Sequence, residues 1–349
     1  MQTLSVAHQE AIRHKFDNLL ADVAEQGASD LHLSTDWQPV IRRNGELHTM
    51  EPIRGLPISP IEAFEHLLDS LLFGHKKEEF ERNGSTDISL SYRTNTGTKI
   101  CRCHIFRYGT CQDAFSIRFF PASIPSCKTL GLPDSLTKLI REEHGLIIVS
   151  GPTGSGKTTT IASLLDRLNE TYGKHIITIE DPIEYVLKDK TSLIHQREVG
   201  MDCPSFAAGL KAALREDPDV ILVGEMRDAE TIATAISAAE TGHLVFSTLH
   251  TANVIEALDR LVQYFPADHH TQIRNELAVC FKGIVAQKLF PCTKGGRVAA
   301  FEILLPMDAT KNVIRKGENH RLYDYMHPSY GMQTMEQAIE GLKKKHLVE

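Results

Sequence analysis

Apolar residues in the first 60 positions recur at two different spacings. From Ala7 to Glu25 they follow the helical period, and Gly27 comes directly after, so we expect one amphipathic helix that ends there. Beyond it the pattern alternates in short segments, and Asn44-Gly45 has the composition of a type I′ hairpin turn. These features predict a helix followed by strands at residues 31–33, 40–42 and 46–47.

Residues 60–82 return to the helical period, which predicts a second helix. After it, a longer hairpin is expected from Asp87 to Phe120, with Gly109 in the turn between its two best-marked strands. Those strands are 100–106 and 114–119.

Alternation within this hairpin places Arg102 and Arg118 on the face opposite the apolar side chains. On pattern alone, an ordinary hydrated sheet surface is favoured over a ligand-binding face. Arg107 lies near the turn, where alternation constrains its direction less.

Proline and glycine residues punctuate positions 121–133, which we interpret as a connection between two domains, 1–120 and 134–349. Beyond the connection, apolar strand segments alternate with helical ones, a pattern typical of a parallel sheet covered on both faces. The expected strands are 146–150, 175–180, 220–223 and 244–249, and the expected helices are 159–168, 206–214, 229–240 and 254–262.

The first of these strands runs into a glycine-rich turn. Residues 151–158 read G-P-T-G-S-G-K-T, which matches the nucleotide-binding pattern G-x-x-x-x-G-K-[ST]. The glycines let backbone N–H groups point at phosphate oxygens, and the helix that follows favours negative charge at its N-terminus. We expect Lys157 to reach the β- and γ-phosphates of ATP and Thr158 to bind Mg²⁺. The candidate nucleotide-binding residues are Gly151, Pro152, Thr153, Gly154, Ser155, Gly156, Lys157, Thr158 and Thr159.

Acidic residues follow two of the other expected strands, at the sheet edge where open α/β sheets bind ligands. Glu225 is the best candidate for the general base that activates water, and it could also hold Mg²⁺. Glu180 would orient water or metal, whereas Asp181 and Glu184 are expected to shape the turn. Taken singly, each acid is equally well explained as a helix cap or a surface residue.

His243 and His250 flank the strand at 244–249. An imidazole at the end of that strand could sense or stabilise a γ-phosphate, so both are candidates. The alternative is a hydrogen-bonded structural histidine, which is favoured for His243 and equally weighted for His250.

Composition then limits the classes of function. With 349 residues, 42% of them hydrophobic, the chain is long enough to form two cores. Its formal net charge is −7, whereas an excess of positive charge is typical of a nucleic-acid binder. No apolar run approaches the roughly 18 residues of a membrane span, and no leader pattern begins the chain, so we expect a soluble, unexported protein.

Seven cysteines without any C-x-x-C pair favour reduced thiols in a cytoplasm over a disulfide framework. The densest group is Cys101, Cys103, His104 and Cys111, whose spacing fits no usual zinc ligand set. We interpret Cys101 and Cys103 as small core-facing residues of a strand.

Four segments together resemble the Walker A, aspartate, Walker B and histidine boxes of the type II/IV secretion ATPases. They are residues 151–158, 179–184, 214–228 and 241–251. Two further segments, Q-R-E-V-G at 196–200 and Y-G-M-Q-T-M at 330–335, make the chain similar to the type IV pilus retraction ATPase (PilT) family within that group. The resemblance covers nearly the whole chain.

This resemblance implies an α/β protein in which a smaller PAS-like α+β domain precedes a RecA-like, parallel-sheet P-loop ATPase domain with C-terminal helices. It implies a cytoplasmic homohexamer that binds ATP and Mg²⁺ near subunit junctions and acts on the inner-membrane pilus platform protein. Family arginines that reach the phosphates from the amino-terminal domain match Arg102, Arg107 and Arg118, which favours a ligand-binding role for the polar sheet face.

The family comparison also bears on the direction of the motor. Extension and secretion ATPases carry a four-cysteine zinc element after the histidine box, whereas only Cys280 and Cys292 lie there in this chain. We therefore expect no zinc, and retraction is favoured over extension. The family's carboxy-terminal A-I-R-N-L-I motif, which is tied to retraction, reads A-T-K-N-V-I at residues 309–314.

The leading hypothesis is thus an ATPase motor for pilus retraction and twitching motility. A secretion, conjugation or accessory pilus ATPase is the alternative within the same group. From another class, a RecA-like nucleic-acid translocase should show a basic channel, which the net charge does not indicate, so no nucleic-acid partner is expected. A GTPase switch is disfavoured because the sequence contains no N-K-x-D guanine-reading motif.

Overall fold

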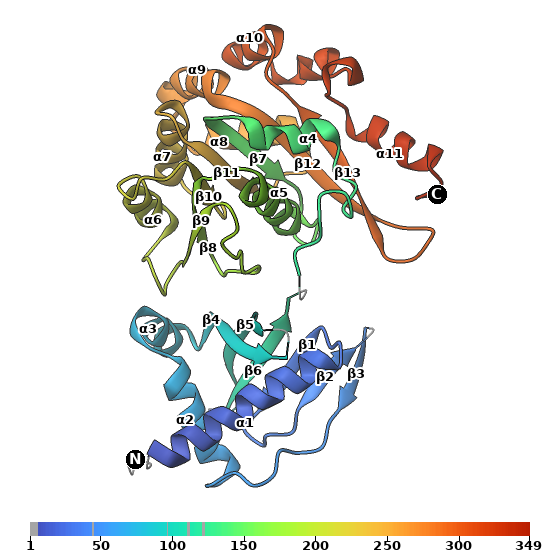
Figure 1. Cartoon of the computed structure of the whole chain (residues 1–349). Coiled ribbons are helices and arrows are strands. Elements are labelled where there is room, and N and C mark those ends of the chain that lie inside the picture. Colours follow the sequence, from blue (N-terminus) through green and yellow to red (C-terminus); the bar gives the residue numbers. More distant parts are fainter. Residues whose placement is uncertain (1–5, 44, 96, 110–111, 121–122) are drawn as a thin grey trace. The chain divides into compact units, whose positions relative to one another are not determined.

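The computed structural model describes residues 6–43, 45–95, 97–109, 112–120 and 123–349, which form two compact units (Figure 1). Unit 1 contains the chain up to Ser123 together with Pro182–Val186 and Gly200–Asp202, and unit 2 contains the remainder. Each unit has its own sheet. Within the described ranges, no helix is both long and apolar enough to cross a membrane.

Unit 1 is an antiparallel sheet of six strands in the order β3-β2-β1-β6-β5-β4, with three helices (Figure 1). Its helices are α1 (Val6–Glu25), α2 (Pro60–Leu71) and α3 (Gly74–Asn83). Its strands are β1 (Asp30–Ser34), β2 (Val40–Arg43), β3 (Glu46–Thr49), β4 (Ser85–Thr94), β5 (Gly97–Tyr108) and β6 (Gln112–Phe119).

The core of unit 1 forms where α1 and α2 pack on one face of this sheet. Phe64 of α2 stacks on Phe115 of β6 at a centroid distance of 4.4 Å, and Phe16 of α1 meets the same ring edge to face at 5.8 Å. Trp37 is fully buried beside Phe64, and its indole N–H donates to the carbonyl of Pro60. Cys101 and Cys103 also point into this core, as their alternation predicted.

Two details of unit 1 differ from the sequence expectation. Residues 60–82 form two helices, because Leu72 and Phe73 adopt extended backbone and Gly74, with φ of 52°, begins the next helix. Ile61 departs from the helical apolar period predicted for this segment, because its side chain is exposed rather than packed with the other apolar residues of α2. Asn44 of the predicted hairpin turn and Cys111 lie outside the described residues.

Unit 2 is a seven-stranded sheet in the order β13-β12-β7-β11-β10-β8-β9, parallel except for the edge strand β13. Its strands are β7 (Gly145–Ser150), β8 (His175–Glu180), β9 (Leu193–Glu198), β10 (Val220–Val223), β11 (Leu244–Leu249), β12 (Phe281–Pro291) and β13 (Arg297–Leu304). The predicted parallel sheet is confirmed, and the four strands predicted for this unit are present.

Helices cover both faces of this sheet (Figure 1). One face carries α4 (Asp134–Lys138), the 3-10 helix η1 (Leu139–Arg141) and α5 (Lys157–Thr171). The other carries α6 (Phe206–Ala213), α7 (Ala229–Glu240), α8 (Val254–Gln263) and α9 (His270–Cys280). Alternate strand residues divide between the two cores: Ile147 and Val149 face α5, whereas Leu146 and Ile148 face the other layer.

The C-terminal part of unit 2 follows β13 as short helices. They are α10 (Asp308–Lys316), η3 (Asn319–Tyr325), η4 (Pro328–Tyr330) and α11 (Met335–Lys344), whereas the 3-10 helix η2 (Ala267–His269) lies earlier, directly before α9. Gln333, between η4 and α11, exchanges two backbone hydrogen bonds with Ile303 of β13. This bridge ties the C-terminal segment to the edge of the sheet.

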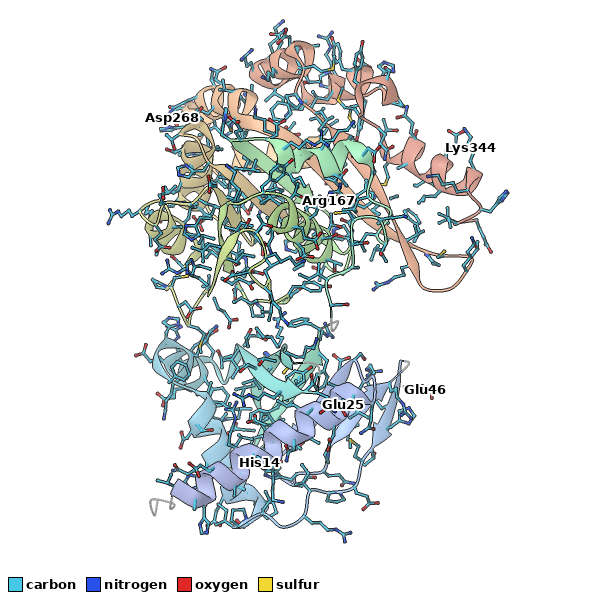
Figure 2. All side chains as sticks on the ribbon, viewed as in Figure 1. His14, Glu25, Glu46, Arg167, Asp268 and Lys344 are labelled. Atoms are coloured by element: carbon cyan, nitrogen blue, oxygen red, sulfur yellow. The ribbon has the colours of Figure 1, made fainter. Side chains whose placement is uncertain are left out.

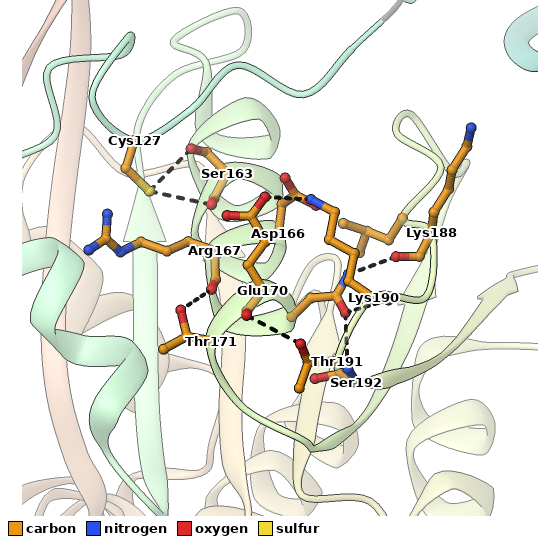
Figure 3. A network of polar contacts seen from close by, with 12 residues as sticks. Cys127, Ser163, Asp166, Arg167, Glu170, Thr171, Lys188, Lys190, Thr191 and Ser192 are labelled. Carbon is orange, nitrogen blue, oxygen red and sulfur yellow. Dashed lines mark hydrogen bonds and ion pairs between the residues drawn. The ribbon is translucent and has the colours of Figure 1, made fainter.

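Helix α5 is also held by a polar network on its outer side (Figure 3). Lys190 forms ion pairs with Asp166 and Glu170, both on α5, at 2.7 and 2.8 Å. Asn169, fully buried on the same helix, donates to the Lys188 carbonyl at 2.7 Å. Arg167 lies on α5 among the side chains drawn for unit 2 (Figure 2).

Candidate functional site

The glycine-rich loop between β7 and α5 has a backbone that other residues could not easily adopt. Gly151, Gly154 and Gly156 have φ of 149°, 78° and 87°, in the region that favours glycine. A Cβ on Gly151 would lie 2.5 Å from the Gln287 carbonyl oxygen, whereas one on Gly154 would meet nothing within 4 Å. The loop is therefore pressed against the protein at Gly151 and open at Gly154.

Lys157 begins α5, and its side chain turns back over this loop. Its Nζ donates to the carbonyls of Gly151 and Pro152 at 2.7 and 3.2 Å and lies 3.4 Å from His250 Nδ1. The helix has no side-chain cap at its N-terminus and no acidic residue in its first turn. Its N–H groups and dipole therefore present positive charge to the loop, which suits a phosphate.

Two buried polar side chains at the loop, Ser155 and Gln287, differ in their hydrogen bonding. Ser155 Oγ is buried and has no hydrogen-bond partner among the described residues. Gln287 of β12, which sequence reasoning missed, is buried and donates from Nε2 to the Ser155 carbonyl at 2.7 Å. The signal that could have found it is a polar residue directly after the apolar run 284–286.

Glu225 follows β10 and lies between two partners from different segments. Its Oε2 accepts from Arg227 Nε at 2.8 Å, and its Oε1 lies 3.4 Å from His250 Nε2. Because His250 also approaches Lys157, the three side chains form one chain of contacts at the carboxyl edge of the sheet. The structure thus brings Glu225, His250 and the loop lysine together.

Glu180 ends β8 at the same edge and is buried. Its Oε1 accepts hydrogen bonds from Thr178 Oγ1 at 2.6 Å and from Gln196 Nε2 at 3.0 Å. The adjacent Asp181 lies 3.6 Å from Arg227, which links it to Glu225. The carboxylate of Glu180 is therefore held in one orientation by β8 and β9.

His243 is placed differently from the prediction. It precedes β11, and its carbonyl accepts from Gly145 at the start of β7, while its Nδ1 contacts the Ala238 carbonyl at 3.0 Å. His250 follows the other end of the six-residue strand, so roughly 20 Å separates the two ends. Within one chain, His243 is a hydrogen-bonded histidine at the amino edge and not part of the loop site.

In unit 1, Arg102 and Arg118 are direct cross-strand partners on β5 and β6, on the face away from the core. Like charges opposite each other repel, and an aspartate relieves each: Asp87 contacts Arg102 and Asp30 contacts Arg118, both at 2.9 Å. The polar-face prediction for these two arginines is confirmed. Arg107 instead lies over the Phe80 ring of α3 and pairs with Asp113.

Burial and the neighbouring side chains act in opposite directions on the pKa of Asp87. Burial acts to raise the pKa of this carboxyl, but the hydrogen bond and charge of Arg102, together with His104, outweigh burial and hold the pKa below its usual value. The aspartate therefore stays ionised and orients the Arg102 guanidinium.

The residues at the loop fit a nucleotide with Mg²⁺ in their chemistry. A hydroxyl from Thr158 and a carboxylate from Glu225 are the oxygen ligands that Mg²⁺ prefers. Ser155 Oγ is buried with its hydrogen-bonding capacity unused among the described residues, and the space beside Gly154 is open.

Comparisons with known proteins find relatives that match nearly the whole chain. The family model described as "Type II/IV secretion system protein" matches residues 6–346. The type IV pilus retraction ATPase PilT of Pseudomonas aeruginosa is 40% identical over 95% of this chain and 94% of its own length. A twitching motility protein of Neisseria gonorrhoeae is 38% identical over 90% of this chain and 84% of its own.

A solved structure of the pilus retraction motor PilT with bound ADP agrees in fold. Its TM-score is 0.84 at 44% identity, with 95% of this chain and 94% of that chain covered. The agreement extends across both sheets of the chain and is not limited to the glycine-rich loop. The chain therefore belongs to the type II/IV secretion system protein family and has the fold of its pilus retraction ATPases.

Proposed function

We propose that this chain is the subunit of a homohexameric, ATP-hydrolysing motor that powers type IV pilus retraction and twitching motility. The observation that carries the proposal is the contact chain from the loop lysine through His250 to Glu225, at the carboxyl edge of a P-loop sheet. Its membership of a family of ATPases, and its 40% identity to a retraction ATPase over 95% of the chain, support the assignment.

In this proposal the loop from Gly151 to Thr159 binds the phosphates of ATP through its backbone N–H groups. Lys157 exchanges its contacts with the loop carbonyls for contacts with the β- and γ-phosphates. Thr158, with Glu225 directly or through water, would hold Mg²⁺, which when bound neutralises charge on the phosphate oxygens.

Hydrolysis then needs a base next to the attacking water. Glu225 takes a proton from that water, whose oxygen forms a bond to the γ-phosphorus while the bond to the β–γ bridging oxygen breaks, giving ADP and phosphate. Arg227 and His250 hold the Glu225 carboxylate, and Glu180 orients the water.

Arginines of unit 1 complete the site in this scheme. We assign Arg102 and Arg118 to the phosphates bound by a neighbouring subunit, because they form an exposed cationic pair on one sheet face. Arg107 remains a candidate with a different geometry, since its guanidinium lies over Phe80. The proposed ring would act from the cytoplasmic face of the inner membrane on the pilus platform protein.

The test is surface pilus load and surface motility after disruption of the gene in its native host. Complementation would use wild type and Glu225→Gln. Abundant pili on immotile cells, corrected by wild type alone, are the expected result. Cells without pili would indicate an extension motor, and unchanged pili would indicate a secretion ATPase.

A further inference from the structure

We propose that Gln287 is a positioning residue that fixes the phosphate-binding loop in its nucleotide-binding conformation. Its side-chain amide makes two hydrogen bonds to different parts of the loop and helix. Nε2 donates to the Ser155 carbonyl at 2.7 Å, and Oε1 accepts from Thr160 Oγ1 at 2.8 Å. The inference rests on nucleotide binding at this loop and not on the direction of pilus movement.

These two bonds need one donor and one acceptor at the end of a single side chain, which glutamine supplies at every pH. One end must donate to a carbonyl and the other must accept from a hydroxyl, which Gln does within one rigid plane. Gln287 and Thr160 are each 2% exposed, so neither bond can be replaced by bulk water. An apolar residue at 287 would leave two buried polar groups unpaired.

Gln287 belongs to the sheet, whereas its two hydrogen-bond partners belong to the loop and to α5. In β12 it lies on the same face as Val285, a member of the core that faces α5. The strand pairs in parallel with β7, from which the loop departs, with Ala286 opposite Ser150. The Gln287 amide therefore links the loop to β12, the neighbour of the strand β7 from which the loop begins.

The loop also approaches Gln287 closely at two glycines. A Cβ on Gly156 would lie 2.9 Å from Gln287 Nε2, and one on Gly151 would lie 2.5 Å from the Gln287 carbonyl oxygen. Main-chain and side-chain atoms of one residue thus contact both ends of the six-residue loop 151–156. The loop N–H directions are determined by this contact, since glycine itself imposes little conformational preference.

A merely structural glutamine would affect folding but not the loop in particular. Gln287→Glu distinguishes the two roles because a protonated carboxylic acid can still donate to Ser155 O and accept from Thr160, whereas a carboxylate cannot donate. Burial favours the neutral acid, so its titration falls within an accessible range. Affinity for nucleotide should therefore depend on pH in this variant through the group at position 287.

The experiment measures the Kd of a fluorescent ADP for the full chain between pH 5.5 and 8.5, as the ratio of variant to wild type at each pH. For Gln287→Glu we expect binding about tenfold weaker or more at pH 8.5, with recovery toward the wild-type value at pH 5.5. A ratio that stays at one across this range, in a folded variant, overturns the inference.

Asn169→Asp is the matched control. Asn169 is a buried amide on α5 that also donates to a main-chain carbonyl, that of Lys188, but its hydrogen-bond partners lie in residues 188–192 and not in the phosphate-binding loop. Its carboxylate variant should lower stability without a pH-dependent change in the Kd ratio. If both variants show the same pH-dependent loss of binding, the effect of Gln287 is general destabilisation and the inference is wrong.

A second pair of variants keeps the test decisive if Gln287→Glu does not fold. Thr160→Val removes the hydroxyl that Gln287 accepts from, whereas Thr160→Ser retains it. We expect weaker ADP binding for the valine variant and near wild-type binding for the serine variant. Equal binding by both overturns the inference, and absence of nucleotide binding by wild type itself would instead overturn the proposed function.

Discussion

Glu225 is the single residue on which the proposed chemistry depends most directly. Its carboxylate lies 2.8 Å from Arg227 and 3.4 Å from His250, so replacement by glutamine preserves size while removing the proton acceptor. For Glu225→Gln we expect single-turnover ATP hydrolysis to fall by about 10²–10⁴, the usual contribution of a general base. The Kd for ATP should stay within a few-fold of wild type, because the loop is intact.

Asp181→Asn is the control for this prediction. Asp181 contacts the same arginine at 3.6 Å, so its amide variant perturbs Arg227 without removing the base. We expect it to retain most of the turnover. If Glu225→Gln hydrolyses bound ATP at the wild-type rate, another residue is the base.

Asp87 gives a prediction about stability and pH. Its folded pKa is lowered by Arg102 and His104 despite burial, so its ionised form stabilises unit 1 above the unfolded pKa. That contribution is lost as the pH falls through the folded pKa, which lies below the usual value for an aspartate. Because the pair is partly exposed, we expect Asp87→Asn to cost about 0.5–1 kcal/mol at pH 7.

Urea unfolding followed by tryptophan fluorescence measures this effect, since Trp37 is the single tryptophan and lies in the core of unit 1. The difference in the free energy of unfolding between wild type and Asp87→Asn should shrink as the pH is lowered from 7 to 3. A difference that grows toward acid pH would contradict the assignment of the lowered pKa.

At the level of the element, the glycines of the phosphate-binding loop have different roles. For Gly151→Ala we expect loss of nucleotide binding, because the added Cβ would lie 2.5 Å from Gln287 O and 2.6 Å from Ser155 Oγ. Gly154→Ala has open space and only the cost of its positive φ, about 1 kcal/mol. ADP titration of both variants checks this order, and equal losses would contradict the contact argument.

The elements of unit 2 that sequence predicted best were those with a single uninterrupted pattern. The loop motif, its strand and its helix were evident because glycine, lysine and apolar residues are locally diagnostic. The role of Gln287, on the strand β12 that was also missed, could not be predicted. Its hydrogen-bond partners Ser155 and Thr160 are more than 120 residues away in the sequence. Local periodicity contains no information about such long-range contacts.

Two other failures have local causes. The helix expected over 60–82 is divided because extended backbone at Leu72 and Phe73 interrupts a continuous apolar period. The prediction for His243 treated both flanks of β11 alike, although only the carboxyl end of a parallel strand faces the ligand edge. Alternation did predict the shared face of Arg102 and Arg118, because a strand period of two requires no distant information.

At the scale of the whole molecule, the proposed ring would make the site of one subunit depend on residues of the next. Arg118 is 69% exposed in its side chain and pairs with Asp30, so it can contact a partner without breaking the core of unit 1. For Arg118→Ala we expect turnover to fall by about 10³, the lower range for an arginine that stabilises phosphoryl transfer. The fluorescence unfolding curve of Trp37 should be unchanged.

Mixing distinguishes action within a subunit from action between subunits. Lys157→Ala removes the loop lysine but retains Arg118, whereas Arg118→Ala retains the lysine. If Arg118 acts on the neighbouring subunit, rings that contain both variants regain ATP turnover, because some sites receive an intact lysine from one subunit and an intact arginine from the next. Turnover no greater than the sum of the separate variants, after subunit exchange is verified with differently tagged chains, would place Arg118 in the site of its own subunit or outside the site.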